Sequence, residues 1–290
     1  QRRYVAAFDG ALPAPLLRAL QEAFSPESAF WSEHGYNSET CKPGYFSYLH
    51  RLGGEGPPET TLDQAIQALW RLAASRFPEV AEARFAEWWA HNRPHCSGHQ
   101  LHFDSDNEGQ GGVRNPIISS VLYLTGGVGG PTLVTTQTLK SKRLSKQGWV
   151  VHPKENRVCL FDGSVLHGVI PGRGISPAAK PAAAVSGAAS AADLGPPGRS
   201  PRGPTPPASA PPGRGGGGGG GGAPLAANPG RRLEGSGARS QGPEPAPRPP
   251  RRVTWMVAFW RDIRPRPPGP DGRTGAAQPY PGLGAGRTWP

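Results

Sequence analysis

The sequence predicts a mainly β protein with helices near its N-terminal end, which is an α+β fold class. Two observations carry this prediction. Helical periodicity is confined to the residues before Pro78, and strand-like segments separated by Gly, Pro, Asn and Asp follow it. Helices followed by about seven or eight short strands are typical of an antiparallel sandwich or barrel that the helices support.

The N-terminal part begins with a short strand at 4–9, which a turn at Asp9-Gly10 ends. A helix is expected after Pro15. A stronger helix follows a threonine cap at 60–61, with Asp63 in its first turn. Its apolar face is formed by Leu62, Ile66, Leu69, Trp70, Ala73 and Phe77.

The later segments have the length and composition of strands. They cover residues 83–92, 99–104, 115–125, 131–137, 148–153, 156–163, 167–172 and 251–263. The last of these is separated from the others by a long segment of different composition. We see no internal repeat.

That composition divides the chain. We expect one domain made of residues 1–173 and 251–263, with helical support in 1–80 and a β core in 81–173 and 251–263. The Gly/Pro/Ala/Arg-rich residues 174–250 contain no aromatic side chain, so they cannot bury enough apolar surface to order themselves. Residues 264–290 have a similar composition, and we predict disorder in both segments. The insertion is either a genuine surface loop, which costs roughly 2–3 kcal/mol in closure entropy, or a translated intron.

Charge and cysteine content exclude several classes of protein. The net charge of +11 comes almost entirely from residues after 173, because residues 1–173 hold 17 basic and 16 acidic side chains. This low-complexity excess gives little support for nucleic-acid binding by the folded part. Cys41, Cys96 and Cys159 form neither a disulfide framework nor a zinc spacing, which favours a reducing compartment. No apolar run approaches the ~20 residues of a membrane span. Because the chain begins with Gln1, we expect a fragment or a processed form, and localisation stays open.

The stretch "HQLHFDSDNEGQGG", residues 99–112, is crowded with side chains that bind metals. One interpretation is a calcium loop, since Asp104, Asp106 and Glu108 alternate and Gly109 follows. Against it, the twelfth position is Asn115 rather than glutamate, and a strand follows instead of a helix. A second interpretation is a polar turn without any ligand.

A third interpretation is the facial triad of two histidines and one carboxylate that holds non-haem iron(II). His102 and Asp104 are two residues apart on one strand, so both side chains point to the same face. His167 is the candidate for the third ligand. His95 and His99 are alternative ligands, but neither has a carboxylate at the matching offset.

An ordered set of motifs extends this third interpretation. HxD at 102–104 is followed after about sixty residues by "HGV" at 167–169, and then by basic residues on the last strand. Between them stand "SSVLYLT", "GGPTLV" and "VVHPKENRVCLFDGSVLHGV". Over residues 4–173 and 251–263 the sequence resembles the Fe(II)- and 2-oxoglutarate-dependent dioxygenases, and most of all their prolyl 4-hydroxylase-like branch. The resemblance implies a double-stranded β-helix, or jelly-roll, core.

The resemblance also implies a cation on the last strand for the far carboxylate of 2-oxoglutarate. Alternation along the strand favours Arg252, which shares a mixed face with Thr254 and Met256. Arg251 remains an alternative, on a face of larger apolar residues. Tyr123 matches a position where similar enzymes place a hydroxyl on the same carboxylate. This chain departs from its relatives in the position of this arginine. Arg252 stands 85 residues after the distal histidine, His167, whereas relatives usually have the arginine about ten residues after it.

The function that the resemblance implies is hydroxylation of a C–H bond, with Fe(II), 2-oxoglutarate and O2, optionally ascorbate, and release of succinate and CO2. It implies no catalytic side chain beyond the metal ligands. A peptidyl proline or another protein side chain is the first candidate substrate, and a small molecule is the second. Ala258 stands where the nucleic-acid repair branch commonly carries a second arginine. The rival function is a non-catalytic binding module whose Pro/Arg-rich segment recruits partners. The sequence gives no indication of oligomeric state.

Overall fold

A computed structural model of the chain describes most of the N-terminal part and the last strands. The described residues are 3–36, 46–54, 60–106, 112–173, 249–264, 266 and 275–280. They all belong to one compact unit, Gln1–Ala183 with Arg248–Pro290. The predicted disordered insertion lies outside the described residues, except for positions 249 and 250, and so do Glu108 and Gly109 of the predicted calcium loop.

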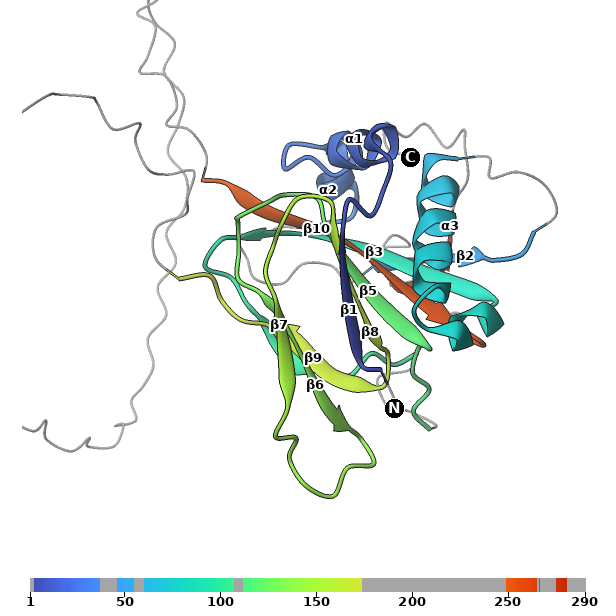
Figure 1. The fold of residues 1–290 in the computed structure, drawn as a ribbon. Helices are drawn as coiled ribbons and strands as arrows, with labels where there is room; N and C mark the ends of the chain where they lie inside the picture. The colour runs from blue at the N-terminus through green and yellow to red at the C-terminus, as the bar shows by residue number, and fades with distance from the viewer. Residues whose placement is uncertain are drawn as a thin grey trace, which may run out of the picture. The chain divides into compact units, whose positions relative to one another are not determined.

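Two sheets form the unit (Figure 1). The seven-stranded sheet has the order β1 (Val5–Asp9), β8 (Arg157–Asp162), β5 (Ile118–Tyr123), β10 (Arg251–Trp260), β3 (Phe85–Pro94), β2 (Phe46–Arg51) and β11 (Gly275–Pro279). The four-stranded sheet has the order β4 (His99–His102), β9 (Val165–Val169), β6 (Thr132–Thr138) and β7 (Gly148–Val151). Neighbouring strands are antiparallel except for β11, which runs parallel to β2.

The path of the chain between the sheets is that of a double-stranded β-helix. Strands β3, β5, β8 and β10 lie in the large sheet, and β4, β6, β7 and β9 lie in the small sheet. The chain therefore crosses from one sheet to the other repeatedly as it passes from β3 to β10. The predicted jelly-roll core is confirmed, and β10 completes it from across the long insertion, between β5 and β3.

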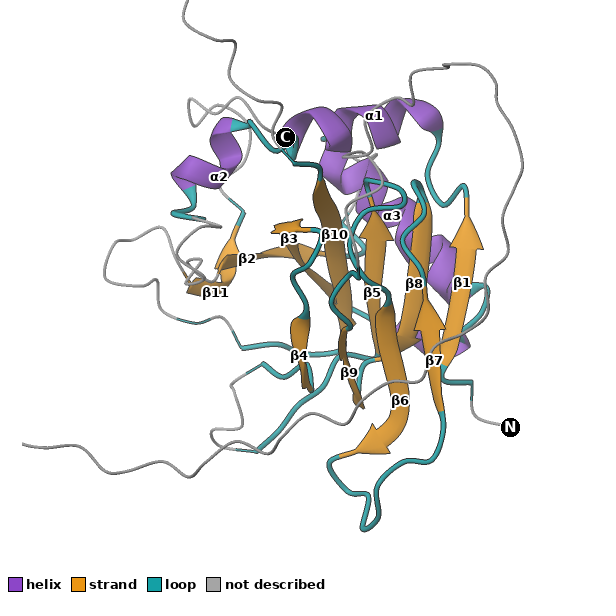
Figure 2. Cartoon of the chain, turned by 90° about the vertical axis from the view of Figure 1, so that its left-hand side faces the viewer, coloured by secondary structure: helices purple, strands orange, loops and turns teal. Residues whose placement is uncertain are grey.

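Helices cover the outer face of the large sheet, while the small sheet faces its other side (Figure 2). They are α1 (Ala14–Ala23), α2 (Ala29–Glu33) and α3 (Thr61–Ala74), followed by the 3₁₀ helix η1 (Pro78–Glu82). Thr60 and Asp63 form the capping box that starts α3, as the sequence predicts. Helix α1 begins before Pro15 rather than after it, because proline is tolerated in a first helical turn.

The two faces of β10 pack against different parts of the molecule. Val253, Trp255, Val257 and Phe259 are buried in the core beneath the helices. Met256 faces the other way and belongs to the smaller core between the two sheets. This is the alternation that the sequence of the strand predicts.

Four elements were not predicted. Helix α2 and strand β2 lie in the region expected to give helical support, η1 follows the last predicted helix, and β11 lies in the tail expected to be disordered. The prediction of disorder is therefore wrong for Gly275–Pro279. The reason is that an edge strand such as β2 offers unpaired backbone groups, which a segment of low hydrophobicity can pair with. The described part of the chain contains no helix long and apolar enough to cross a membrane.

Candidate metal centre

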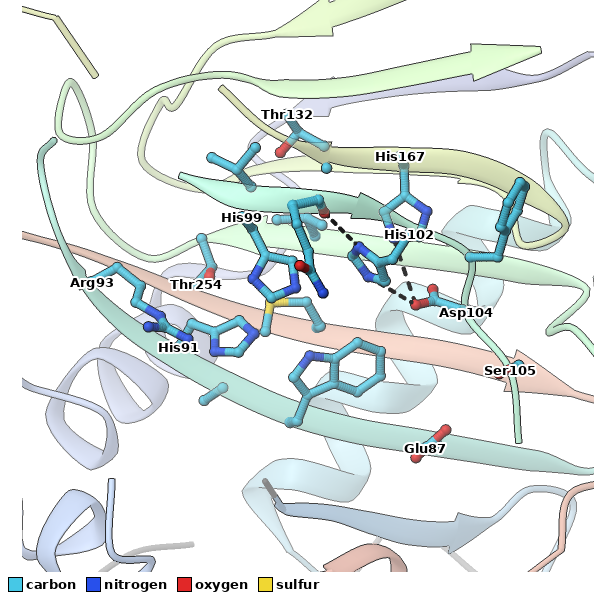
Figure 3. A pocket seen from close by; sticks show the side chains of 18 of the residues that line it. Glu87, His91, Arg93, His99, His102, Asp104, Ser105, Thr132, His167 and Thr254 are labelled. Carbon is cyan, nitrogen blue, oxygen red and sulfur yellow. Dashed lines mark hydrogen bonds and ion pairs between the residues drawn. The ribbon is translucent and has the colours of Figure 1, made fainter. Parts of the chain in front are cut away.

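A cavity of about 650 Å³ opens between the two sheets, and Figure 3 shows the side chains around it. Its floor is formed by alternate residues of β3 and β10, and its wall by residues of β4 and β9. His102, Asp104 and His167 all line it, so the structure brings together the three residues that the sequence predicts as metal ligands. His167 lies opposite His102 in the pairing of β4 with β9.

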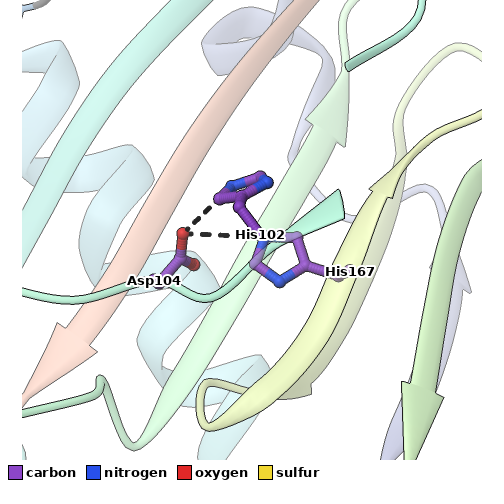
Figure 4. Close-up of side chains that lie close together, drawn as sticks. All are labelled: His102, Asp104 and His167. Atoms are coloured by element: carbon purple, nitrogen blue, oxygen red, sulfur yellow. Dashed lines mark ion pairs between the residues drawn. The ribbon is translucent and has the colours of Figure 1, made fainter. Parts of the chain in front are cut away.

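The three side chains converge on one point (Figure 4). The Nε2 atom of His102 lies 3.5 Å from Oδ1 of Asp104, and Nε2 of His167 lies 3.6 Å from the same oxygen. One ligand atom from each residue falls within a cluster in which no two atoms are more than 4.8 Å apart. Two imidazoles and one carboxylate on one side of a cavity are a donor set suited to Fe(II) with open positions.

Hydrogen bonds fix which nitrogen each histidine presents. Nδ1 of His102 lies 2.9 Å from the carbonyl oxygen of Gln100, and Nδ1 of His167 lies 3.1 Å from that of Val165. A carbonyl oxygen can only accept, so each Nδ1 carries the proton and donates it. Both Nε2 lone pairs are then free to face Asp104, an arrangement that is common for histidines that bind metals.

The carboxylate of Asp104 is held in its ionised form. Burial alone would raise its pKa, but the positive charges that His167 and His102 carry when protonated, together with hydrogen bonds from His102 and Ser119, outweigh burial and lower the pKa to about 2. The Ser119 hydroxyl donates to Oδ2 at 2.6 Å, which leaves Oδ1 toward the histidines. Asn115 donates to the backbone oxygen of Asp104 and holds the end of the HxD segment.

Arg252 lies at one end of the cavity, with only 6% of its surface exposed. Its Nη2 lies 3.5 Å from Oγ1 of Thr132, and its buried Nε has no hydrogen-bond partner among the described residues. Burial lowers the pKa of Arg252, yet the guanidinium stays protonated because its normal pKa is so high. Gly129, at φ +83°, leaves room for this side chain, since a Cβ there would collide with it.

Arg251 points elsewhere and does not line this cavity. Its Nη2 donates to the backbone oxygen of Asn92 at 2.8 Å, and its Nε donates to the amide oxygen of the same residue. Tyr123 is fully buried beneath the site, with its ring 5.5 Å from the guanidinium carbon of Arg252. Its hydroxyl pairs with Thr132 at 2.7 Å and donates to Val151 O at 2.9 Å. Thr132 lines the cavity, and Tyr123 lies behind it.

Comparisons with known proteins find similarity only at the level of structure. No protein-family model matches the sequence, and no curated protein matches it. Among solved structures, a Pseudomonas putida prolyl-4-hydroxylase matches with 16% identity and a TM-score of 0.41, over 89% of this chain and 93% of that one. A 2OG-Fe(II) oxygenase family oxidoreductase from Burkholderia pseudomallei matches with 13% identity and a TM-score of 0.36, over 93% and 88%. HygX from Streptomyces hygroscopicus, with nickel and 2-oxoglutarate bound, matches with 9% identity and a TM-score of 0.36, over 95% and 92%.

The alternative ligands lie outside the cluster. His95 accepts the backbone N–H of Gly129 through its Nδ1 at 3.0 Å, so that nitrogen is occupied. The ring of His99 stands 4.7 Å from that of His102, and burial followed by the charge of His102 lowers its pKa to about 4. His99 is therefore a neutral neighbour of the cluster at physiological pH.

The calcium-loop interpretation does not fit the side chain of Asp106. Its carboxylate is buried and turned toward two arginines, with Arg264 Nε at 3.8 Å and Arg114 Nε at 4.0 Å. Arg266 Nε donates to the backbone oxygen of Asp106 at 3.0 Å. An aspartate surrounded by three guanidinium groups has its charge balanced by the protein and is not available to a calcium ion.

One face of β3 also lines the cavity, although none of the sequence motifs described above includes it. Glu87, Trp89, His91 and Arg93 alternate along the strand and all face the cavity. The signal was present in "AEWWAHNR", whose alternate positions place an acid, an indole, an imidazole and a cation on a single face. A buried acid such as Glu87 is unusual, because burial of a charge is costly.

Proposed function

We propose that the protein is an Fe(II)- and 2-oxoglutarate-dependent dioxygenase that hydroxylates a C–H bond. The observation that carries the proposal is one cavity that holds a His-Asp-His cluster and, apart from it, a buried arginine with an unpartnered Nε. The first fits a metal ion and the second fits a carboxylate. A cosubstrate that binds the metal at one end and carries a carboxylate at the other needs both.

In this proposal His102 and His167 bind Fe(II) through their Nε2 atoms and Asp104 binds it through Oδ1. The bound iron supplies the activation of O2 with the two electrons released when 2-oxoglutarate loses CO2. The backbone carbonyls that accept the Nδ1 protons keep both rings in place. Ser119 holds the carboxylate so that one oxygen remains for the metal. No further catalytic side chain is required.

The far carboxylate of 2-oxoglutarate is proposed to bind Arg252, with the hydroxyl of Thr132 as its neighbour. A carboxylate in this place would satisfy the buried Nε and the remaining N–H groups of the guanidinium. Tyr123 helps by orienting Thr132 through its hydroxyl and by placing its ring beside the guanidinium. The role of Arg251 is then to hold Asn92 and not to bind the cosubstrate.

The balance of the reaction follows from this assignment. O2 delivers one oxygen to the substrate carbon, which becomes an alcohol, and the other to the new carboxylate of succinate. The C1–C2 bond of 2-oxoglutarate breaks with release of CO2, and the substrate C–H bond supplies the other two electrons. Ascorbate would serve only to return oxidised iron to Fe(II). Candidate substrates are a peptidyl proline, another protein side chain or a small molecule.

The test is iron content together with succinate formation. The wild-type protein should bind one Fe(II) and form succinate from 2-oxoglutarate, and Asp104→Ala should reduce both by more than about 100-fold, because the carboxylate is the only anionic ligand. Asp106→Asn, in the same segment but turned to arginines, is the matched control and should keep its iron. A wild-type protein that binds no iron would instead support the rival, a jelly-roll binding module.

A further inference from the structure

The cavity floor has a different charge at each end. Along β3 the cavity-facing residues run from Arg93 to Glu87, and along β10 they run from Arg252 to Trp260. Arg93 lies opposite Arg252 in the pairing of the two strands, so two cations share one end. Arg93 and Glu87 are six positions apart, which is roughly 20 Å along a strand. Figure 3 shows Arg93 and Glu87 at opposite ends of the same strand.

Glu87 is buried and lines the cavity, and among the described residues its carboxyl has one hydrogen bond of normal geometry. The hydroxyl of Ser47 donates to Oε1 at 2.5 Å. Ser47 in turn accepts the backbone N–H of Ala277, so its own proton is committed to Glu87. The indole N–H of Trp260, which also lines the cavity, lies close enough to lower the pKa of this carboxyl, although it completes no hydrogen bond of normal geometry. A buried carboxyl that lines a cavity and has one such hydrogen bond can accept further donors.

Glu87 lies in the same cross-strand row as Ser119, which donates a hydrogen bond to Asp104 of the His-Asp-His cluster. Ala258 of β10 pairs with Ser119 of β5 on one side and with Glu87 of β3 on the other. Two strand spacings place Glu87 about 10 Å from Ser119, which holds Asp104. The residue between them is alanine, whose side chain leaves the path open. A substrate carbon at the metal and a group at Glu87 would thus be about one extended side chain apart.

The surroundings of Glu87 favour a cation over a neutral donor. The aromatic residues Trp89, Trp260 and Phe46 line the cavity beside it, and aromatic ring faces attract organic cations. Burial, and then the negative charge of Asp104, raise the pKa of Glu87 to about 7 against the hydrogen bond from Ser47. The positive charge of Arg266 and the indole N–H of Trp260 oppose this and lower the pKa. A cationic ligand would add a charged donor to the carboxylate.

We propose that Glu87 is a specificity-determining residue that binds an ammonium or guanidinium group of the substrate. This inference rests on the proposed function, because it takes the metal cluster as the place where the substrate is oxidised. It narrows the candidates to a lysine or arginine side chain of a polypeptide, or to a free amine or guanidine. It disfavours proline, whose ring in a peptide carries no charge.

The first experiment measures binding alone. The full-length protein is titrated at pH 8 with n-butylammonium chloride and, separately, with the neutral n-butanol, and the indole N–H signals of its tryptophans are followed by NMR. The wild-type protein should bind the cation at least about tenfold more tightly than the alcohol, since a charge-assisted hydrogen bond is lost with the alcohol. Glu87→Gln should bind both equally.

A matched control is Glu82→Gln, which removes an exposed acid that pairs with Arg261 and lies outside the cavity. It should keep the preference for the cation. Equal binding of cation and alcohol by the wild-type protein, or an unchanged preference in Glu87→Gln, would overturn the proposal. This measurement does not depend on turnover. The preference for the cation can therefore be absent from a protein that binds iron and forms succinate, and it can be present in a protein that does neither.

The second experiment separates the sources of the cation. Succinate formation is measured with peptides that differ only in a central Lys, Arg, norleucine or Pro, and with free n-butylammonium. At least tenfold faster turnover of the Lys or Arg peptide than of the norleucine peptide identifies a protein side chain, and turnover of the free amine alone identifies a small molecule. A proline or norleucine peptide that is the best substrate contradicts the proposal. In Glu87→Gln, KM for the cationic substrate should rise while KM for 2-oxoglutarate is unchanged.

Discussion

The two ends of the cavity are built from the same two strands but serve different kinds of ligand. At one end, Arg252 and Arg93 are paired across β10 and β3, and the guanidinium of Arg252 has an unpartnered Nε. At the other end, the carboxyl of Glu87 lines the cavity between aromatic residues and is held by Ser47. The His-Asp-His cluster faces the space between these ends. The first end suits an anion and the second suits a cation.

This difference separates the part of the cavity that carries family-like motifs from the part that no motif indicates. The motifs that resemble a known family lead to the cluster and to Arg252, which would hold the cosubstrate. No motif led to Glu87, although strand alternation alone would have placed it in the cavity. The part that distinguishes one substrate from another is thus carried by residues without a signature spacing.

The largest effect should come from the cationic end. Arg252→Ala removes the charge-assisted hydrogen bonds proposed to hold the far carboxylate, a loss of about 3 kcal/mol. We expect KM for 2-oxoglutarate to rise about 100-fold in succinate-release kinetics, with iron content unchanged. Arg251→Ala is the control, since Arg251 binds Asn92 outside the cavity. Equal effects of the two substitutions would remove the distinction between the arginines.

At the acidic end, a substitution that removes the proposed function should increase the stability of the fold. Folding raises the pKa of Glu87 from 4.5 to about 7, so the folded state binds its proton more tightly than the unfolded state does. The stability that this proton contributes is present below pH 4.5 and is lost as the pH rises through about 7. Glu87→Gln should therefore be more stable than wild type at pH 8, by up to about 3 kcal/mol, and nearly equal to it at pH 5.

Urea unfolding at the two pH values measures this difference. A substitution that stabilises the fold but removes the preference for cations is typical of a residue kept for function. A loss of stability in Glu87→Gln at pH 8 would show that the network of Ser47, Glu87 and Ala277 is needed to hold the strands together. Glu87 would then serve the fold.

The smallest effect should come from the residue that links the cluster to the row containing Glu87. Ser119→Ala removes the hydroxyl that orients Asp104 and should weaken Fe(II) binding about tenfold, measured by competition with a chelator. Ser120→Ala is the control, because the Ser120 hydroxyl bonds to the backbone of Val257 on the other face of the sheet. It should lower stability and leave iron affinity unchanged.

Much of the fold and of the metal cluster could be predicted because short-range patterns encode them. A two-residue spacing places His102 and Asp104 on one face, and alternation along 251–260 separates Arg252 from Arg251. Strand β11 could not be predicted, because it pairs with β2 through its backbone and its composition resembles that of the rest of the tail. The row of Ser119, Ala258 and Glu87 depends on strand register, which only the folded sheet fixes.

The position of β10 has a consequence for how the chain folds. This strand lies at the centre of the large sheet, yet it pairs with β3 across separations such as 93 to 252. Contacts of such long range slow folding, and a ribosome must add the whole intervening segment, at about 5–20 residues per second, before the sheet can close. Until then β5 and β3 each have an open edge that can pair with another chain. Folding of this protein is therefore expected to be largely post-translational and to need protection from aggregation during synthesis.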